Sequence, residues 1–85
     1  MQIIYSPKFA REYKKLPLNI KLLAEKAETL FRKDSFNPKL KTHKLKGRLA
    51  DFWAFSIDFK YRIIFEFKDR DTVWFHSAGD HDIYQ

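Results

Sequence analysis

Two kinds of hydrophobic periodicity divide this chain into a helical first half and a stranded second half. Between residues 20 and 31, apolar side chains recur at i, i+3, i+4, i+7, i+10 and i+11, a spacing that places them along one face of a helix. They are Ile20, Leu23, Ala24, Ala27, Leu30 and Phe31. Lysine and glutamate fill the opposite face, which we interpret as solvated surface. The pattern predicts one long amphipathic helix.

A short strand and a shorter helix precede this long helix. Residues 2–5 are β-branched or aromatic at three of their positions, Ile3, Ile4 and Tyr5, which favours a strand. Ser6 and Pro7 then provide an N-cap and a proline at the first helical position, where the missing N–H is not needed. Apolar residues follow at the helical spacing of Phe9, Tyr13 and Leu16. Because Pro17 comes directly after this helix, we expect an antiparallel two-helix hairpin.

The second half alternates with a period of two, which predicts strands. Asn37-Pro38 ends the helical pattern, and a basic loop from Lys39 to Arg48 leads into the strands. The expected strands are Phe52–Ile57, Tyr61–Phe67 and Thr72–Ser77. Short polar turns join them, so the three strands form an antiparallel meander.

The phase of these strands separates an apolar face from a face that can hold reactive groups. One face carries Trp53, Phe55, Ile57, Tyr61, Ile63, Phe65 and Phe67. The other carries Ala54, Ser56, Asp58, Arg62, Ile64 and Glu66. We therefore predict an α+β fold in one domain, residues 1–85, with the N-terminal strand and the helix hairpin packed on one face of a twisted antiparallel sheet. Arg62 then stands on the open face beside two small side chains.

Composition narrows the class of protein and its partners. The 85 residues carry a formal net charge of +6 and no cysteine, which excludes a disulfide framework and thiolate metal sites. No apolar run is long enough for a membrane span, and the N-terminus does not resemble a signal peptide, so we expect a cytoplasmic protein. A basic domain attracts polyanions such as nucleic acid. An acidic protein partner, or lysines that only solvate the surface, would also account for the charge.

Four stretches, in this order, resemble the RelE/ParE toxin superfamily of bacterial toxin–antitoxin systems. They are Thr42–Gly47, Phe52-Trp53, Ile57–Phe65 and Gly79–Tyr84. The resemblance extends over essentially the whole chain, and no single motif is specific. The ending is similar to the Gly-Thr-His-Asp tail of the RelE/StbE and YafQ-like branch, with Asp80 in place of threonine. The resemblance implies a RelE-like microbial ribonuclease-type fold.

The resemblance also implies an activity: a metal-independent, ribosome-dependent mRNA endonuclease in which a 2′-OH attacks the adjacent phosphate and translation stops. His43 matches a catalytic histidine of YafQ-like relatives, and Arg62 matches the strand arginine of RelE and YoeB. His81 matches the position of the presumed general acid, and Tyr84 matches an aromatic that positions the substrate base. Two imidazoles and a guanidinium suit this reaction, because it needs proton transfer near neutral pH and fixed positive charge at the phosphate.

The remaining cations of the basic loop are expected to bind RNA phosphate. Lys46 matches a phosphate-contacting residue of RelE, and Lys44 and Arg48 add electrostatic attraction. The chain departs from the family at Ala54 and Ser56, where RelE has lysines and YafQ has an Asp and a His. Neither side chain can act as a base, so that role falls to His43.

Other interpretations of these residues stay open. His43 and His81 could be a loop and a turn histidine, Arg62 could pair with Glu66, and Tyr84 could pack on the core. His76 we interpret as part of the sheet. The spacing of Asp80, His81 and Asp82 with His76 matches no strong zinc pattern, so we predict no metal and no small-molecule cofactor.

Two other functions compete with the nuclease. A ParE-like toxin would inhibit DNA gyrase without cutting RNA, and an inactive homologue would act only by binding protein. In each case the resemblance implies a cognate antitoxin protein as partner. For the nuclease it also implies the ribosome and mRNA.

Overall fold

The computed structural model describes residues 1–80 of the chain. The predicted helices and strands follow one another in the expected order. The strands and helices are β1 (Gln2–Tyr5), α1 (Pro7–Lys14), α2 (Leu18–Lys33), β2 (His43–Lys44), β3 (Trp53–Ser56), β4 (Arg62–Phe67) and β5 (Thr72–Gly79). Two 3-10 turns, η1 (Pro38–Leu40) and η2 (Gly47–Leu49), flank β2. No helix within residues 1–80 combines the length and apolar character that crossing a bilayer requires.

The strands form one five-stranded sheet in the order β1-β5-β4-β3-β2. Strands β3, β4 and β5 pair antiparallel, as predicted, and β2 pairs antiparallel with β3. β1 was predicted to pack on one face of an antiparallel sheet, but it is instead an edge strand that pairs parallel with β5, which makes the sheet mixed. Both helices and three strands separate β1 from β5 in the sequence. Because no short turn joins the two strands, their connection allows either a parallel or an antiparallel pairing.

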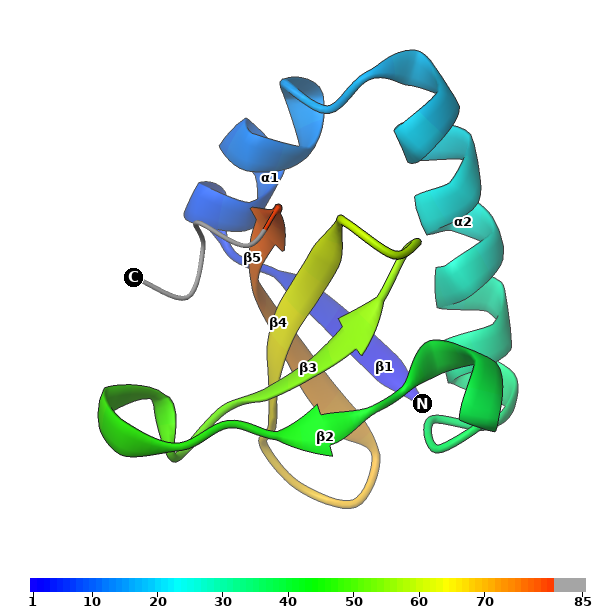
Figure 1. The fold of residues 1–85 in the computed structure, drawn as a ribbon. Coiled ribbons are helices and arrows are strands. Elements are labelled where there is room, and N and C mark those ends of the chain that lie inside the picture. The colour runs from blue at the N-terminus through cyan, green and yellow to red at the C-terminus, as the bar shows by residue number, and fades with distance from the viewer. Residues whose placement is uncertain (81–85) are drawn as a thin grey trace.

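Both helices begin where the sequence predicts. The Ser6 hydroxyl accepts a hydrogen bond from the Phe9 N–H at 2.9 Å, and Pro7 occupies the first turn of α1. α2 buries Ile20, Ala24, Ala27 and Phe31, the predicted apolar face. Leu23 was expected on that face but is 38% exposed, because it lies at the border of the stripe. Figure 1 shows the two helices bordering the twisted sheet, with α2 running along one side of it.

A cluster of phenylalanine rings joins α2 to the sheet. Phe31 is fully buried and stacks on Phe55, with ring centroids 4.7 Å apart. Its ring also meets Phe65 edge-on at 4.9 Å and Phe75 at 5.7 Å. One helical side chain therefore contacts three neighbouring strands, as the strand phase predicted. Such aromatic pairs add to the free energy of burying their area.

The predicted basic loop is not irregular throughout, which corrects the sequence analysis. His43 and Lys44 form the edge strand β2 on β3, and the two 3-10 turns lie on either side. Two residues with positive φ make these turns possible: Lys41 at 52° and Gly47 at 67°. At Gly47 a side chain would be strained in that backbone region even though the space around it is open. The segment between β2 and β3 projects away from α2 (Figure 1).

A β-bulge in β5 changes which side chains reach each face. Phe65 pairs with Phe75, but the preceding residue Ile64 pairs with Ser77, so β5 has one extra residue at this point. The phase of β5 therefore switches. His76 and Ser77 both lie on the face opposite the helices, and Ala78 returns to the core. This shift also brings Gly79 opposite Arg62.

We expect Phe31→Ala to lower the free energy of unfolding by about 3–5 kcal/mol, because it leaves a cavity between α2 and three strands. Leu22→Ala on the same helix is the matched control. Its side chain is 53% exposed, so its cost should stay within about 0.5 kcal/mol. Urea denaturation of both variants measures the difference. Equal destabilisation would contradict the assignment of Phe31 as the central contact.

Candidate functional site

The face of the sheet opposite the helices holds the predicted reactive residues in two rows. In one row, His43, Ala54, Ile64 and Ser77 are neighbours across β2, β3, β4 and β5. In the next row, Arg62 lies between Ser56 and Gly79. The strand phase predicts an open face here. The structure corrects this in part, because Ala54, Ile64 and Ser77 are at most 1% exposed.

His43 lies on edge strand β2 and is exposed. Its Nδ1 is 2.9 Å from the carbonyl oxygen of Lys41. Because a carbonyl can only accept, Nδ1 carries the proton in this hydrogen bond. In the neutral ring Nε2 is then the unprotonated nitrogen. The left-handed backbone of Lys41 aims its carbonyl at the ring and so selects this tautomer.

Arg62 begins β4, and its guanidinium folds over the β3–β4 turn. Nη1 donates to the carbonyls of Asp58 at 2.5 Å and Tyr61 at 3.0 Å, and Nη2 donates to Phe59 at 2.9 Å. The Asp58 carboxylate closes the same turn by accepting from the N–H groups of Lys60 and Tyr61. Glu66, the alternative partner expected from the sequence, pairs with Lys68 at 3.8 Å. The guanidinium has five N–H donors, so Nε–H and one Nη2–H remain for a ligand.

His43 and Arg62 lie on the same face of the sheet. They are two strands apart and one row apart in register. With strands about 4.8 Å apart and residues about 3.4 Å apart along a strand, their backbones are roughly 12 Å apart. The Arg62 guanidinium folds over the β3–β4 turn, away from the His43 row, so only the His43 side chain can shorten this gap. The structure therefore places two of the four predicted catalytic residues on the same face of the sheet.

The other predicted residues divide between an exposed edge and the end of the chain. Lys44, Lys46 and Arg48 are exposed on β2 and in the segment around η2. Their positions suit a non-specific attraction for phosphate. His81 and Tyr84 lie outside the described residues, and their roles stay predictions.

A polar cluster beside β5 was missed by the sequence analysis. Lys8 Nζ in α1 donates to the Ser77 hydroxyl at 2.7 Å and to the Glu12 carboxylate at 3.0 Å. The same carboxylate accepts the Ala78 N–H at 3.1 Å. Because β1 ends at Tyr5, these bonds satisfy the part of the β5 edge that β1 does not cover. The i, i+4 spacing of Lys8 and Glu12 was visible in the sequence, but the bulge that presents Ser77 was not.

His76 lies next to this cluster and contacts Phe52, with ring centroids 4.8 Å apart. It is part of the sheet, as expected, but it also faces the same side as His43 and Arg62. Partial burial lowers the pKa of His76, and the positive charge of Lys8 lowers it further. The negative charges of Glu12 and Glu66 act in the opposite direction. The net effect favours a neutral ring at neutral pH.

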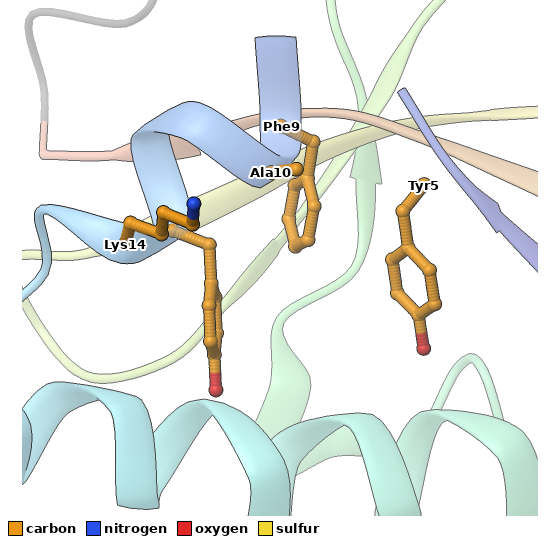
Figure 2. Close-up of a pocket in the computed structure, with 5 residues that line it drawn as sticks. Tyr5, Phe9, Ala10 and Lys14 are labelled. Atoms are coloured by element: carbon orange, nitrogen blue, oxygen red, sulfur yellow. The ribbon is translucent and has the colours of Figure 1, made fainter. Parts of the chain in front are cut away.

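The described residues also form two concave surfaces. A cavity of about 350 Å³ between α1 and α2 is lined by Tyr5, Phe9, Ala10, Tyr13 and Lys14. Figure 2 shows the ring of Tyr5, from β1, and the ring of Phe9, from α1, pointing toward α2. A cleft of about 330 Å³ lies between the end of α1 and the end of β5. It is bordered by Glu12, Lys15, Tyr61, Gly79 and Asp80, among others.

Two tyrosines that line the first cavity form hydrogen bonds with α2 through their hydroxyl groups. The Tyr5 hydroxyl donates to the Glu28 carboxylate at 2.9 Å, and the Tyr13 hydroxyl donates to the Lys21 carbonyl at 3.4 Å. Burial raises the pKa of both tyrosines, so both hydroxyls remain protonated donors. Phe9 stacks between the two rings, with centroids 5.6 Å and 5.8 Å away. This aromatic groove lies on the helical side of the molecule.

Comparison with known proteins gives structural matches over the full length. No family model matches the sequence, and no curated protein sequence matches it. YafQ from E. coli strain BL21(DE3) superposes with a TM-score of 0.81 and 17% identity, covering 98% of this chain and 96% of YafQ. A copper-bound mutant toxin from Helicobacter pylori has a TM-score of 0.77 and 25% identity, covering 100% of this chain and 99% of that toxin.

A third match comes from a complex. The toxin–antitoxin complex RelBE2 from Mycobacterium tuberculosis contains a chain with a TM-score of 0.69 and 22% identity, covering 94% of this chain and 96% of that chain. The likeness confirms the predicted α+β architecture and the fold that the sequence motifs resembled.

We expect the stability of the wild type to fall more steeply than that of His76→Phe as the pH drops below the ordinary histidine pKa of 6.5. A histidine whose pKa is lowered by folding binds fewer protons in the folded state, so acid favours the unfolded chain. Above that pH the His76 ring is neutral in both the folded and the unfolded state, so it adds no pH dependence to the free energy of unfolding. Phenylalanine keeps a ring against Phe52 but does not titrate.

Urea denaturation of both proteins from about pH 7.5 to about pH 5 measures this difference. Carboxylates contribute equally to both curves and cancel in the comparison. Parallel curves, or a steeper fall for the variant, would contradict the assigned direction of the His76 pKa.

Proposed function

We propose that this chain, which has the fold of the RelE/ParE toxin superfamily, is the toxin of a type II toxin–antitoxin system and cleaves mRNA on the ribosome. The observation that carries the proposal is that His43 and Arg62 lie on one face of the sheet, beside an exposed basic segment. Such a protein acts where ribosomes are, in the cytoplasm.

In this proposal the reaction is an attack of the ribose 2′-oxygen on the adjacent phosphorus. His43 Nε2 takes the proton from the 2′-OH, while the Nδ1–H bond to Lys41 holds the ring in the required tautomer. The 2′-O–P bond forms and the P–O5′ bond breaks, which leaves a 2′,3′-cyclic phosphate. Arg62 and Lys46 supply positive charge where the phosphate gains negative charge. No metal ion is needed for these steps.

The leaving 5′-oxygen must receive a proton. His81 is the group we assign to that step, and Tyr84 is the aromatic side chain that would position a substrate base. Both assignments come from the resemblance of the Gly79–Tyr84 tail to the family. Since β5 ends at Gly79 opposite Arg62, the tail starts at the correct end of the sheet for this role.

The proposed partner besides the ribosome is a cognate antitoxin. RelBE2 is itself a toxin–antitoxin complex. The net charge of +6 favours an acidic segment. The aromatic groove between α1 and α2 is a described surface that could take an apolar side chain of such a segment. Lys14 at its border could pair with a neighbouring carboxylate.

A second function is favoured by one observation. The Arg62 guanidinium already donates to three turn carbonyls, and Ala54 and Ser56 add no charge beside it. A toxin that inhibits gyrase by binding, or an inactive homologue, would need Arg62 only for the turn. A gyrase supercoiling assay beside an mRNA cleavage assay on ribosomes separates these activities.

We expect His43→Ala and Arg62→Ala each to reduce ribosome-dependent mRNA cleavage by about 100-fold or more, since each removes a group that acts in the transition state. Induction of the wild type should arrest growth, and both variants should relieve the arrest. Primer extension on translated mRNA after induction locates the cut sites.

Two controls keep this test specific. Arg70→Ala removes an exposed arginine from the β4–β5 turn at the far end of the sheet, so cleavage should not change. Because Arg62→Ala also removes three hydrogen bonds, its urea midpoint must be measured alongside. Full cleavage by His43→Ala and a folded Arg62→Ala would remove both residues from the proposed mechanism.

A further inference from the structure

Three aromatic rings gather on the sheet face opposite the helices. Trp74 lies between Val73 and Phe75, which are buried in the core, so its ring points to the other side. Phe52 precedes Trp53, which packs against the core, and so shares the side of Trp74. The ring contact with Phe52 places His76 there as well.

These rings are accessible to a ligand. Trp74 is 36% exposed, and Phe52 and His76 are half-buried. Ile4, the partner of Trp74 in register on β1, is also exposed, at 45%. The ring group therefore lies at the border of an exposed apolar surface, which often marks an interaction site.

Two lysines lie beside the rings. Lys68 Nζ is 4.7 Å from the centroid of the Trp74 ring. Lys8 reaches Ser77, the neighbour of His76, at 2.7 Å.

Glu12 and Glu66, whose negative charges act on His76, are each paired with a lysine. Glu12 bonds Lys8 at 3.0 Å, and Glu66 lies 3.8 Å from Lys68. Flat rings with cations around them suit a ligand that has both flat faces and phosphates, which describes single-stranded nucleic acid.

We infer that Phe52, Trp74 and His76 form a nucleobase-stacking platform that binds single-stranded RNA and leads it to His43 and Arg62. The inference rests on the proposed function and names the part of the protein that binds the substrate beside the cleaved bond. A sheet whose exposed aromatic rings stack successive bases is an established solution for RNA.

The spacing along β5 supports this arrangement. Trp74 and His76 are two residues apart, about 6.7 Å along a strand, comparable to the distance between successive bases of an extended strand. Gly79, three residues beyond His76, is opposite Arg62. Bases on the platform therefore belong to nucleotides next to the phosphate at Arg62. Because burial lowers the pKa of His76, its ring is neutral and can stack without being charged.

The experiment measures binding of a short single-stranded RNA whose 2′ positions are all methylated, so that cleavage is blocked. Fluorescence anisotropy with the isolated protein gives the dissociation constant. Trp74→Ala and His76→Ala should each weaken binding about tenfold, within the range for loss of one base–aromatic stack. Trp74→Phe and His76→Phe keep a ring and should bind within about threefold of the wild type.

Two controls distinguish stacking from charge and from damage to the fold. Phe36→Ala removes an exposed ring that contacts Trp53 and Phe67 on the helical side, and should leave binding unchanged. An RNA backbone without bases should bind the wild type and both alanine variants equally. An equal loss on that backbone would overturn the stacking role and leave only electrostatic attraction.

The inference is also overturned if the wild type does not bind the methylated RNA, or if the alanine variants bind it like the wild type. In the second case the rings would be a protein-facing surface. The outcome of this binding experiment is separable from the outcome of the mRNA cleavage test of the proposed function. A protein that binds RNA through these rings but cuts no mRNA retains the platform and loses the nuclease.

Discussion

The alternation of side chains across β3, β4 and β5 is the constraint on which the rest of this structure depends. It places Phe55, Phe65 and Phe75 on one side, where Phe31 of α2 contacts all three rings. A one-residue slip of any of these strands would turn its phenylalanine toward solvent. The same alternation fixes the opposite face, so Arg62 cannot lie beneath the helices while the aromatic core is intact.

Helix α1 has a second structural role beyond covering the core. The β5 strand continues past the end of β1, and its free edge would expose backbone groups. Ser6 satisfies this edge through the Phe75 and His76 carbonyls, and Glu12 satisfies it through the Ala78 N–H. These bonds hold β5 in its bulged register. Packing on one face therefore determines which polar groups the other face presents.

The helices, the strand phase and the side on which Arg62 stands could be predicted from the sequence, because each follows from local periodicity or capping. The parallel pairing of β1 could not, since nothing local to residues 2–5 encodes the direction of a partner 70 residues away. The bulge at His76 was equally invisible, because one extra residue leaves no mark on the hydrophobic pattern. In the candidate site, residue types could be predicted but their hydrogen bonds could not. Nothing in the sequence indicated that Arg62 would close its own turn, or that the left-handed Lys41 would fix the tautomer of His43.

The central claim is that RNA contacts the sheet face opposite the helices. Amide chemical-shift changes on adding an RNA with methylated 2′ positions to labelled protein test it most directly. The account predicts shifts at His43, Ala54, Arg62 and His76, with little change at Ala24 and Ala27 of α2. Shifts confined to the groove between α1 and α2 would contradict it.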